Sequence, residues 1–203
     1  MTFTPQLIGK ATGTNVTSLS ISTPSVPAGG RIFCAICINK DGFDSLTDTA
    51  GNVYEQAAGS QSGVGAFVFQ ATNNLHLANN DQITLAFATP FSASIGAFAV
   101  SGLTSGVINI SSAGQGNDRF PGAAIDNVPA NDWCVGILAV NGPSSDGFTQ
   151  DPTFSNPGNF NTQVTTGFSA YGGYRQSTGG KIVYQPILGI ARIWSCMLVD
   201  MSP

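Results

Sequence analysis

The chain has 203 residues and is sparsely charged, with seven basic and eleven acidic side chains and a formal net charge of -4. This length suits one sandwich or barrel domain, so we expect a single domain over residues 1–203. The acidic balance and the lack of any Lys/Arg run argue against a phosphate-binding surface, and nucleic acid is not an expected partner.

The low charge also bears on assembly. Charged residues make up 9% of the chain, against roughly 25% in an average soluble domain. A folded chain of this mass exposes on the order of 9,000 Å², which leaves about one charge per 500 Å². Because charge is what usually keeps a monomer soluble, we expect part of the surface to be buried against other subunits.

Short apolar or alternating runs bounded by Gly, Pro, Asn and Asp recur throughout, whereas helical periodicity is hard to find. In chain order the candidate strands cover residues 15–22, 31–39, 52–58, 65–72, 81–89, 93–102, 106–113, 132–142, 162–171, 181–185 and 187–199. About ten strands with regular turns predict an all-β fold, a two-sheet antiparallel sandwich that is jelly-roll-like. Residues 1–14 precede these strands and suggest an N-terminal arm.

The N-terminus MTFTPQLIGK lacks the basic, apolar and small-residue order of a signal peptide. No stretch approaches the roughly 20 apolar residues of a membrane span, so no membrane partner is expected. The chain is expected to be made in a cytosol.

The strand at 31–39, RIFCAICIN, is apolar on both faces. Such a strand is either central beneath a covering layer, which we favour, or part of a subunit contact. Its Cys34 and Cys37 have CxxC spacing, but residues three apart on a strand point to opposite faces and cannot share an ion. With Cys134 and Cys196, which also lie in apolar runs, they are expected to be buried free thiols.

The stretch DTAGNVY, residues 48–54, is compatible with a turn or a calcium loop. Ala50, Gly51 and Asn52 tolerate positive φ, which predicts a hairpin tip in which Asp48 accepts backbone hydrogen bonds. Asp41, Asp44, Asp48 and Asn52 offer oxygen ligands, but the acidic rhythm and bidentate glutamate of an EF-hand are missing. The turn is favoured, and no metal or cofactor is expected.

Two long segments rich in Gly, Pro, Ser, Asn and Asp are predicted to be loops, residues 113–132 and 141–162. The second contains Phe148, Phe154 and Phe160. Loops of this length are uncommon unless they bind something, so these phenylalanines are a candidate contact surface. The alternative, slightly favoured, is that they only fix the loop to its own sandwich.

Little in the chain is equipped for catalysis. His76 is the single histidine, no Gly-x-Ser-x-Gly elbow surrounds a nucleophile, and Glu55 is the only glutamate. We therefore expect a protein that is not an enzyme. Trp133 and Trp194 lie in apolar strands and are expected in the core.

Three segments in sequence, SLTDTAGNVYEQAAGS, VGAFVFQATN and NDQITLAFATPFSASIGAFAVSGL, together resemble a β-sandwich pattern of bacteriophage and environmental virus proteins. In that pattern a Thr/Ser-Asp-x-x-Gly-Asn-x-Tyr turn precedes strands of alternating polarity. The pattern ends with Ala-Val followed closely by Gly-Leu. The matching residues here are Thr47, Asp48, Gly51, Asn52, Tyr54, Ala99, Val100, Gly102 and Leu103. The resemblance spans residues 31–103, roughly a third of the chain, and marks turns and core rather than a binding site.

The resemblance implies a phage virion component of the capsid decoration (cement) type. Such a protein would be made in the host cytoplasm without a signal peptide and would act on the capsid surface. Its expected partners are copies of itself, as a homotrimer, and the major capsid protein.

The alternative from another class is a carbohydrate-binding module or a phage tail or spike receptor-binding domain. Its glycan would bind to exposed aromatic side chains in loops. Tyr171, Tyr174 and Arg175, near a glycine-rich turn, are the candidates for that contact.

Overall fold

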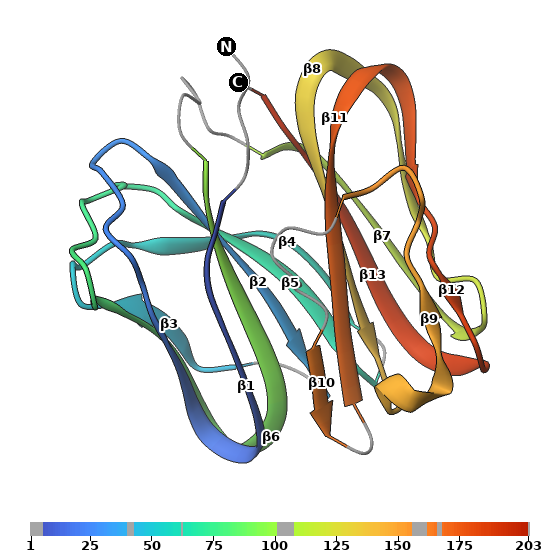
Figure 1. The fold of residues 1–203 in the computed structure, drawn as a ribbon, viewed down its shortest axis with the longest axis horizontal. Coiled ribbons are helices and arrows are strands. Elements are labelled where there is room, and N and C mark those ends of the chain that lie inside the picture. Colours follow the sequence, from blue (N-terminus) through green and yellow to red (C-terminus); the bar gives the residue numbers. More distant parts are fainter. Residues whose placement is uncertain are drawn as a thin grey trace.

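The computed structural model describes residues 6–39, 43–61, 63–100, 108–155, 162–165 and 168–202, which form two facing antiparallel sheets (Figure 1). The first sheet has the order β1 (Gln6–Ser22), β6 (Gln82–Val100), β2 (Arg31–Ile38), β5 (Gly65–Ala71) and β4 (Tyr54–Gln61), with β3 (Ser45–Asp48) also paired to β6. The second has the order β10 (Thr162–Thr165), β11 (Phe168–Tyr184), β8 (Ala123–Val140), β13 (Arg192–Met201) and β7 (Ile108–Asp118). A short pair, β9 (Phe148–Thr149) and β12 (Ile187–Leu188), and a 3-10 turn at Ser144–Asp146 lie outside these sheets. The predicted all-β, two-sheet antiparallel sandwich is confirmed.

Each sheet is built from one half of the chain, and each half also covers the outer face of its own sheet. The long strands β1 and β6 pair along two stretches separated by register shifts between Gly13 and Ser18. Beyond this bend, Ile83 and Leu85 of β6 pack in one apolar cluster with Ile36 of β2. The strands β8 and β11 bend in the same manner and cover the second sheet.

A third apolar layer lies between the two sheets. Cys37 and Phe98 contribute to it from the first sheet, and Ile137 and Met197 from the second. The apolar side chains therefore form three layers, one between the sheets and one on the outer face of each. Among the described residues, polar side chains therefore lie at the edges and turns and on the solvent side of the covering strands, as with Ser20 and Thr84.

Strand β2 is central, between β6 and β5, and is covered on both faces as favoured from its sequence. Ile36 and Cys34 face the outer layer, whereas Ala35 and Cys37 face the second sheet. The two cysteines of the CxxC spacing thus point to opposite faces, as predicted. All four cysteines are free and buried, and burial raises the pKa of Cys34 and Cys37 above that of an ordinary thiol.

Several predicted boundaries are wrong, and Pro90 explains one of them. Residues 81–89 and 93–102 were expected to be separate strands, but residues 82–100 form the single strand β6. Between its pairings at Ala86 and Phe91, β6 shifts register against β1. Pro90 falls at this irregularity, where its missing N–H interrupts no regular ladder.

The predicted loop at 113–132 is also wrong, because β7 continues to Asp118 and β8 begins at Ala123. The predicted strand at 162–171 is two strands, β10 and β11, paired at Thr165 and Phe168. Strand β11 then runs through the glycine-rich segment that was expected to be a turn.

The suggested N-terminal arm is mostly part of the first sheet. Residues 6–14 belong to β1, and Gln6 pairs with Ala99 while Thr12 pairs with Ser94. Residues 1–5 lie outside the described part of the chain.

Replacement of Ile36 with Ala is expected to lower the free energy of unfolding by about 2–5 kcal/mol, because its side chain is fully buried in β2. Urea unfolding followed by tryptophan fluorescence would measure the loss. Val53→Ala is the control, since Val53 is 55% exposed and should change stability by less than about 0.5 kcal/mol. Equal effects of the two substitutions would contradict the layered core.

Candidate functional site

The turn after β3 is a polar network centred on Asp48. Its carboxylate accepts hydrogen bonds from the Asn52 N–H (2.9 Å), the Asn52 side-chain amide (2.8 Å) and the Tyr54 hydroxyl (2.7 Å). Gly51 has a φ of 83°, in the left-handed region that glycine tolerates. The predicted role of Asp48 as an acceptor in a turn is confirmed.

The same turn is not a hairpin tip, and that prediction is wrong. Strand β3 pairs with β6, whereas β4 pairs with β5, so the turn carries the chain from the covering layer to the edge of the first sheet. Asn52 fixes this crossing, because its side-chain oxygen accepts a hydrogen bond from the Leu75 N–H at 2.6 Å. Desolvation by burial, then the nearby Cys34 and the bond to Asp48, raise the pKa of Tyr54. Its hydroxyl therefore stays a donor.

The long segment after β8 packs on its own sandwich. Phe148 stacks on Tyr171 of β11, with ring centroids 3.8 Å apart and an interplanar angle of 8°. Phe154 is buried, and its ring centroid lies 4.8 Å from that of Tyr184. Backbone hydrogen bonds of 2.8 Å in both directions join Ser155 to Tyr174. Phe148 and Phe154 thus contact their own sandwich, as expected if the phenylalanines only fix the loop to it. Phe160 lies outside the described residues.

The remaining candidate contact residues, Tyr174 and Arg175, are consecutive on β11, so their side chains point to opposite faces of the sheet. Tyr174 is half-buried, with its ring centroid 5.4 Å from that of Trp133, and the Arg175 guanidinium lies 5.8 Å from the centroid of the Phe154 ring. The structure therefore brings Arg175 and Phe154 together on the outer face of the second sheet, whereas Tyr174 packs with Trp133 on the opposite face. Because their apolar faces already contact side chains of the same chain, little aromatic surface is presented to solvent here. Trp133 and Trp194 are buried, as predicted.

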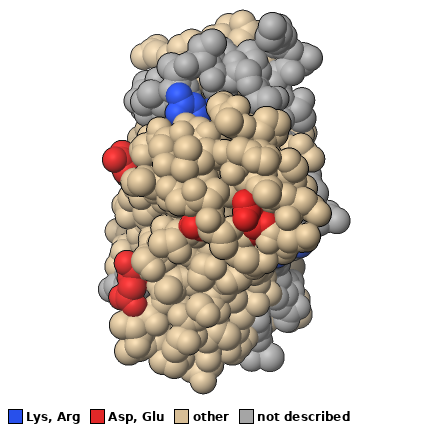
Figure 2. Space-filling model, turned by 90° about the vertical axis from the view of Figure 1, so that its left-hand side faces the viewer, with Lys and Arg blue, Asp and Glu red and all other residues tan. Residues whose placement is uncertain are grey.

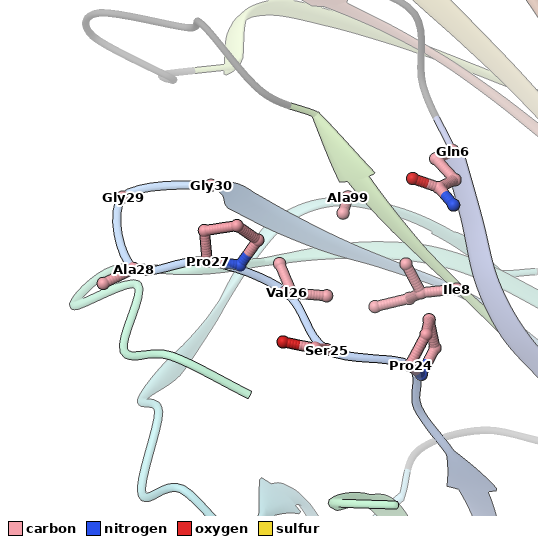
Figure 3. A pocket seen from close by; sticks show the side chains of 10 residues that line it. All are labelled: Gln6, Ile8, Pro24, Ser25, Val26, Pro27, Ala28, Gly29, Gly30 and Ala99. Carbon is pink, nitrogen blue, oxygen red and sulfur yellow. The ribbon is translucent and has the colours of Figure 1, made fainter. Parts of the chain in front are cut away.

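A hollow of about 320 Å³ opens beside the loop between β1 and β2 (Figure 3). Ile8, Pro24, Val26, Pro27 and Ala99 form its apolar lining, together with Gln6, Ser25, Ala28, Gly29 and Gly30. Next to it, the Ser25 hydroxyl lies 3.1 Å from Nε2 of His76. No sequence pattern signals this pair, because Ser25 and His76 are far apart in the chain and neither lies in a recognisable motif.

The Ser25 and His76 pair has the distance of a nucleophile and its general base. An acyl-transfer site also needs N–H donors aimed at the developing oxyanion. The neighbouring N–H groups are already used, since Val26 donates to Leu77, Gly29 to Asn74 and Gly30 to Pro27. The pair is exposed to solvent as well. We therefore interpret it as a surface hydrogen bond that ties the β1–β2 loop to the segment before β6.

A metal site and a membrane-spanning helix are the remaining features to consider in the part of the chain that the structure describes. There, no three His, Cys, Asp or Glu side chains are grouped so as to hold a metal ion. The described residues also contain no helix of the length and apolar character needed to cross a membrane.

The surface is instead marked by few charges and by exposed apolar side chains. Figure 2 shows one face with a few scattered acidic groups separated by broad uncharged areas. Phe120 is 60% exposed and lies near Ile187, because the backbone N–H of Leu188 donates to the Arg119 carbonyl at 2.9 Å. Val53 and Leu75 are also exposed, and the Leu75 N–H donates to the side chain of Asn52, the residue before Val53.

No protein-family model and no curated protein matches the chain. Among solved structures, it is similar to the crystal structure of an IolB-like protein from Salmonella typhimurium LT2, with 9% sequence identity and a TM-score of 0.25. The match covers 92% of this chain and 83% of that one. A TM-score this low supports no conclusion about fold or function.

Replacement of Tyr54 with Phe is expected to destabilise the fold by about 1.5–3 kcal/mol, because it removes a hydrogen bond to a charged acceptor. Urea unfolding at neutral pH would measure the change. Tyr174→Phe is the matched control, since the described residues show no hydrogen bond to that hydroxyl. A Tyr54→Phe variant as stable as the control would contradict the role of the turn network.

Protonation of Asp81 is expected to account for part of the loss of stability of the fold in acid. Its hydrogen bonds from the Thr49 hydroxyl and then from the Ala78 N–H lower its pKa below 3.8. A carboxylate whose pKa is lower in the folded than in the unfolded state stabilises the fold at pH values above its unfolded-state pKa. This stabilisation is lost as the pH falls through its folded-state pKa. Urea midpoints between pH 6 and pH 2.5 should therefore fall less steeply below pH 4 in Asp81→Asn than in the wild type. Parallel curves would refute this role.

Proposed function

We propose that the chain is a structural protein that works through contact surfaces, a virion component of the capsid decoration (cement) type. The observation that carries the proposal is the character of the surface. Seven basic and eleven acidic side chains are spread over 8149 Å², and large apolar side chains such as Phe120 and Ile190 are exposed. Such a surface suits a protein that is partly covered by other subunits.

The function would be mechanical. Burial of edges and loops between neighbouring subunits lowers the free energy of the closed shell, and no side chain has to react. The three apolar layers support this role, because a close-packed interior resists deformation and passes load between contact surfaces. The partners are copies of the chain, with a homotrimer as the form that the resemblance implies, and the major capsid protein. The place of action is the outer surface of the virion.

The second candidate function, glycan binding by a carbohydrate-binding or receptor-binding domain, rests on Tyr174 and Arg175. Both side chains are half-exposed, but they lie on opposite faces of β11, so a glycan would contact Tyr174 or Arg175 and not both. A glycan would have to stack on a tyrosine ring whose one face contacts Trp133. Binding of a glycan to the wild type that is abolished by Tyr174→Ala would favour this alternative.

Light scattering of the purified protein between 1 and 100 μM tests the assembly proposal. The expected result is a molar mass that is a whole multiple, twofold or more, of the 20.8 kDa of one chain. This mass should persist on dilution into the low micromolar range. A threefold mass would support the decoration type in particular. A monomer at every concentration would contradict the proposed function and leave glycan binding as the candidate to test next.

A further inference from the structure

We propose that the chain is an internal duplication of one structural unit, present over residues 6–100 and again over residues 108–202. The two units meet through the inner faces of their sheets, as the subunits of a symmetric dimer do. The inner face of each sheet is thus an interaction surface, and its partner is the equivalent unit of the same chain. The proposal does not rest on the proposed function, because it concerns how the chain is built and not what the chain contacts.

The two sheets have the same strand order. In chain order, the five main strands are β1, β2, β4, β5 and β6 in the first unit and β7, β8, β10, β11 and β13 in the second. Both sheets place them third, fourth, second, fifth, first, as β4-β5-β2-β6-β1 and β10-β11-β8-β13-β7. Consecutive strands usually lie side by side, but in this order only the third and fourth do. The shared order is therefore a specific match.

The pairing registers of the two sheets also correspond. In each second strand, one residue lies opposite a fully buried serine of the fifth strand and, on its other side, opposite an alanine of the fourth. These sets are Cys37, Ser94 and Ala66 in the first unit and Ala139, Ser195 and Ala170 in the second. Equivalent positions can therefore be assigned residue by residue.

An equivalent hydrogen bond follows at the end of each second strand. The Asn39 N–H donates to the Ser92 carbonyl at 3.1 Å, and the Asn141 N–H donates to the Ile193 carbonyl at 2.9 Å. Each acceptor lies two residues before the buried serine of its fifth strand. The two units thus share a side-by-side contact that strand order alone does not require.

The sequence after each second strand repeats as well. Residues 39–43 read NKDGF and residues 141–148 read NGPSSDGF, so an asparagine is followed in both by Asp-Gly-Phe. Each phenylalanine lies against the aromatic residue that follows the alanine of the fourth strand. The ring pairs are Phe43 with Phe67, with centroids 6.1 Å apart, and Phe148 with Tyr171, with centroids 3.8 Å apart.

An approximate two-fold axis along the strands relates the two units (Figure 1). The fifth strands, β6 and β13, end in one apolar cluster that contains Val100 and Met201, so equivalent strands run in the same direction. Across the sandwich, β1 lies near β10 and β4 lies near β7. The first strand of each unit therefore meets the third strand of the other. Such reciprocal contacts are those of a two-fold interface between like partners.

The second strands, β2 and β8, are central in their sheets, so the axis passes between them. They are in contact, because the Cys37 thiol donates to the Leu138 carbonyl at 3.7 Å. Ala35 and Ile137 occupy equivalent positions on these strands, and both are buried in the layer between the sheets. Interiors are close-packed, so a large side chain on one unit needs a small one on the other. The two units have this complementary form at the axis.

Exchange of these two residues tests the two-fold relation. Ala35→Ile should overpack the layer and Ile137→Ala should leave a cavity, so each substitution alone should lower the urea midpoint. Together they only move the larger side chain across the axis, and the double variant should recover about half or more of the summed loss. The matched control combines Ile137→Ala with Ala66→Ile. Ala66 is buried in the same layer, but its equivalent is Ala170, so these losses should add.

A circular permutant gives a second measurement on the whole chain. Residue 203 is joined to residue 1 by a short Gly/Ser linker and the chain begins at residue 104, so the second unit precedes the first. Among the described strands, none of one unit pairs with a strand of the other. The permutant should therefore keep the far-UV circular dichroism of the wild type and a cooperative urea transition of unchanged slope.

The outcomes are distinct. Losses that add in the Ala35→Ile, Ile137→Ala variant as they do in the control overturn the two-fold relation. If Ile137→Ala alone is unfolded, a folded double variant supports the relation and an unfolded one overturns it. A permutant that does not fold overturns the division of the chain into two equivalent units. Each of these results leaves the assembly proposal standing, because that proposal depends on the molar mass in light scattering.

Discussion

The fold depends on covering both faces of strands that are apolar on both sides. In β2, Ile36 and Cys37 point in opposite directions and both are fully buried. A single sheet-on-sheet contact can cover one face only, so each sheet needs a second layer. The long strands β1, β6, β8 and β11 supply it by bending over the outer faces. Close approach of the layers then restricts single positions, as at Gly136, where a Cβ would lie 2.4 Å from the Tyr184 ring.

This layered arrangement places the polar chemistry at the turns, and there the acidic residues mostly serve the fold. Asp48 and Asp81 accept hydrogen bonds within their turns, and Asp118 does so at the end of β7. Asp151 accepts a hydrogen bond from the Thr153 N–H at 2.9 Å. Asp146 forms an ion pair of 2.6 Å with Arg192. These carboxylates stay charged, but their acceptor positions are taken up by groups of the same chain, so they hold the turns in place.

Sequence patterns predicted the fold class but not the path of the chain. Alternation in Ile83, Leu85 and Phe87 identifies a strand with one buried face, and the doubly apolar RIFCAICI identifies a central one. The two strands expected at 81–89 and 93–102 are one strand, because the effect of Pro90 depends on whether a partner strand needs an N–H at that position, and only the register shows that it does not. The contacts of Ser25 with His76 and of Asn52 with Leu75 join distant segments. Local propensity carries no information about such contacts.

Strand β7 shows how a composition typical of loops can form a strand when its packing requires small residues. Small and uncharged residues are common in turns, so SSAGQGN predicts a loop when read locally. In the fold, Gly114 and Gly116 are there to admit the Gly122 backbone and the Trp194 ring. The same residues give β7 low intrinsic strand propensity and no bulky apolar side chain between Ser111 and Asn117. The strand forms despite this low propensity because it pairs regularly with β13 and because its glycines allow the close approach of Trp194 and Gly122.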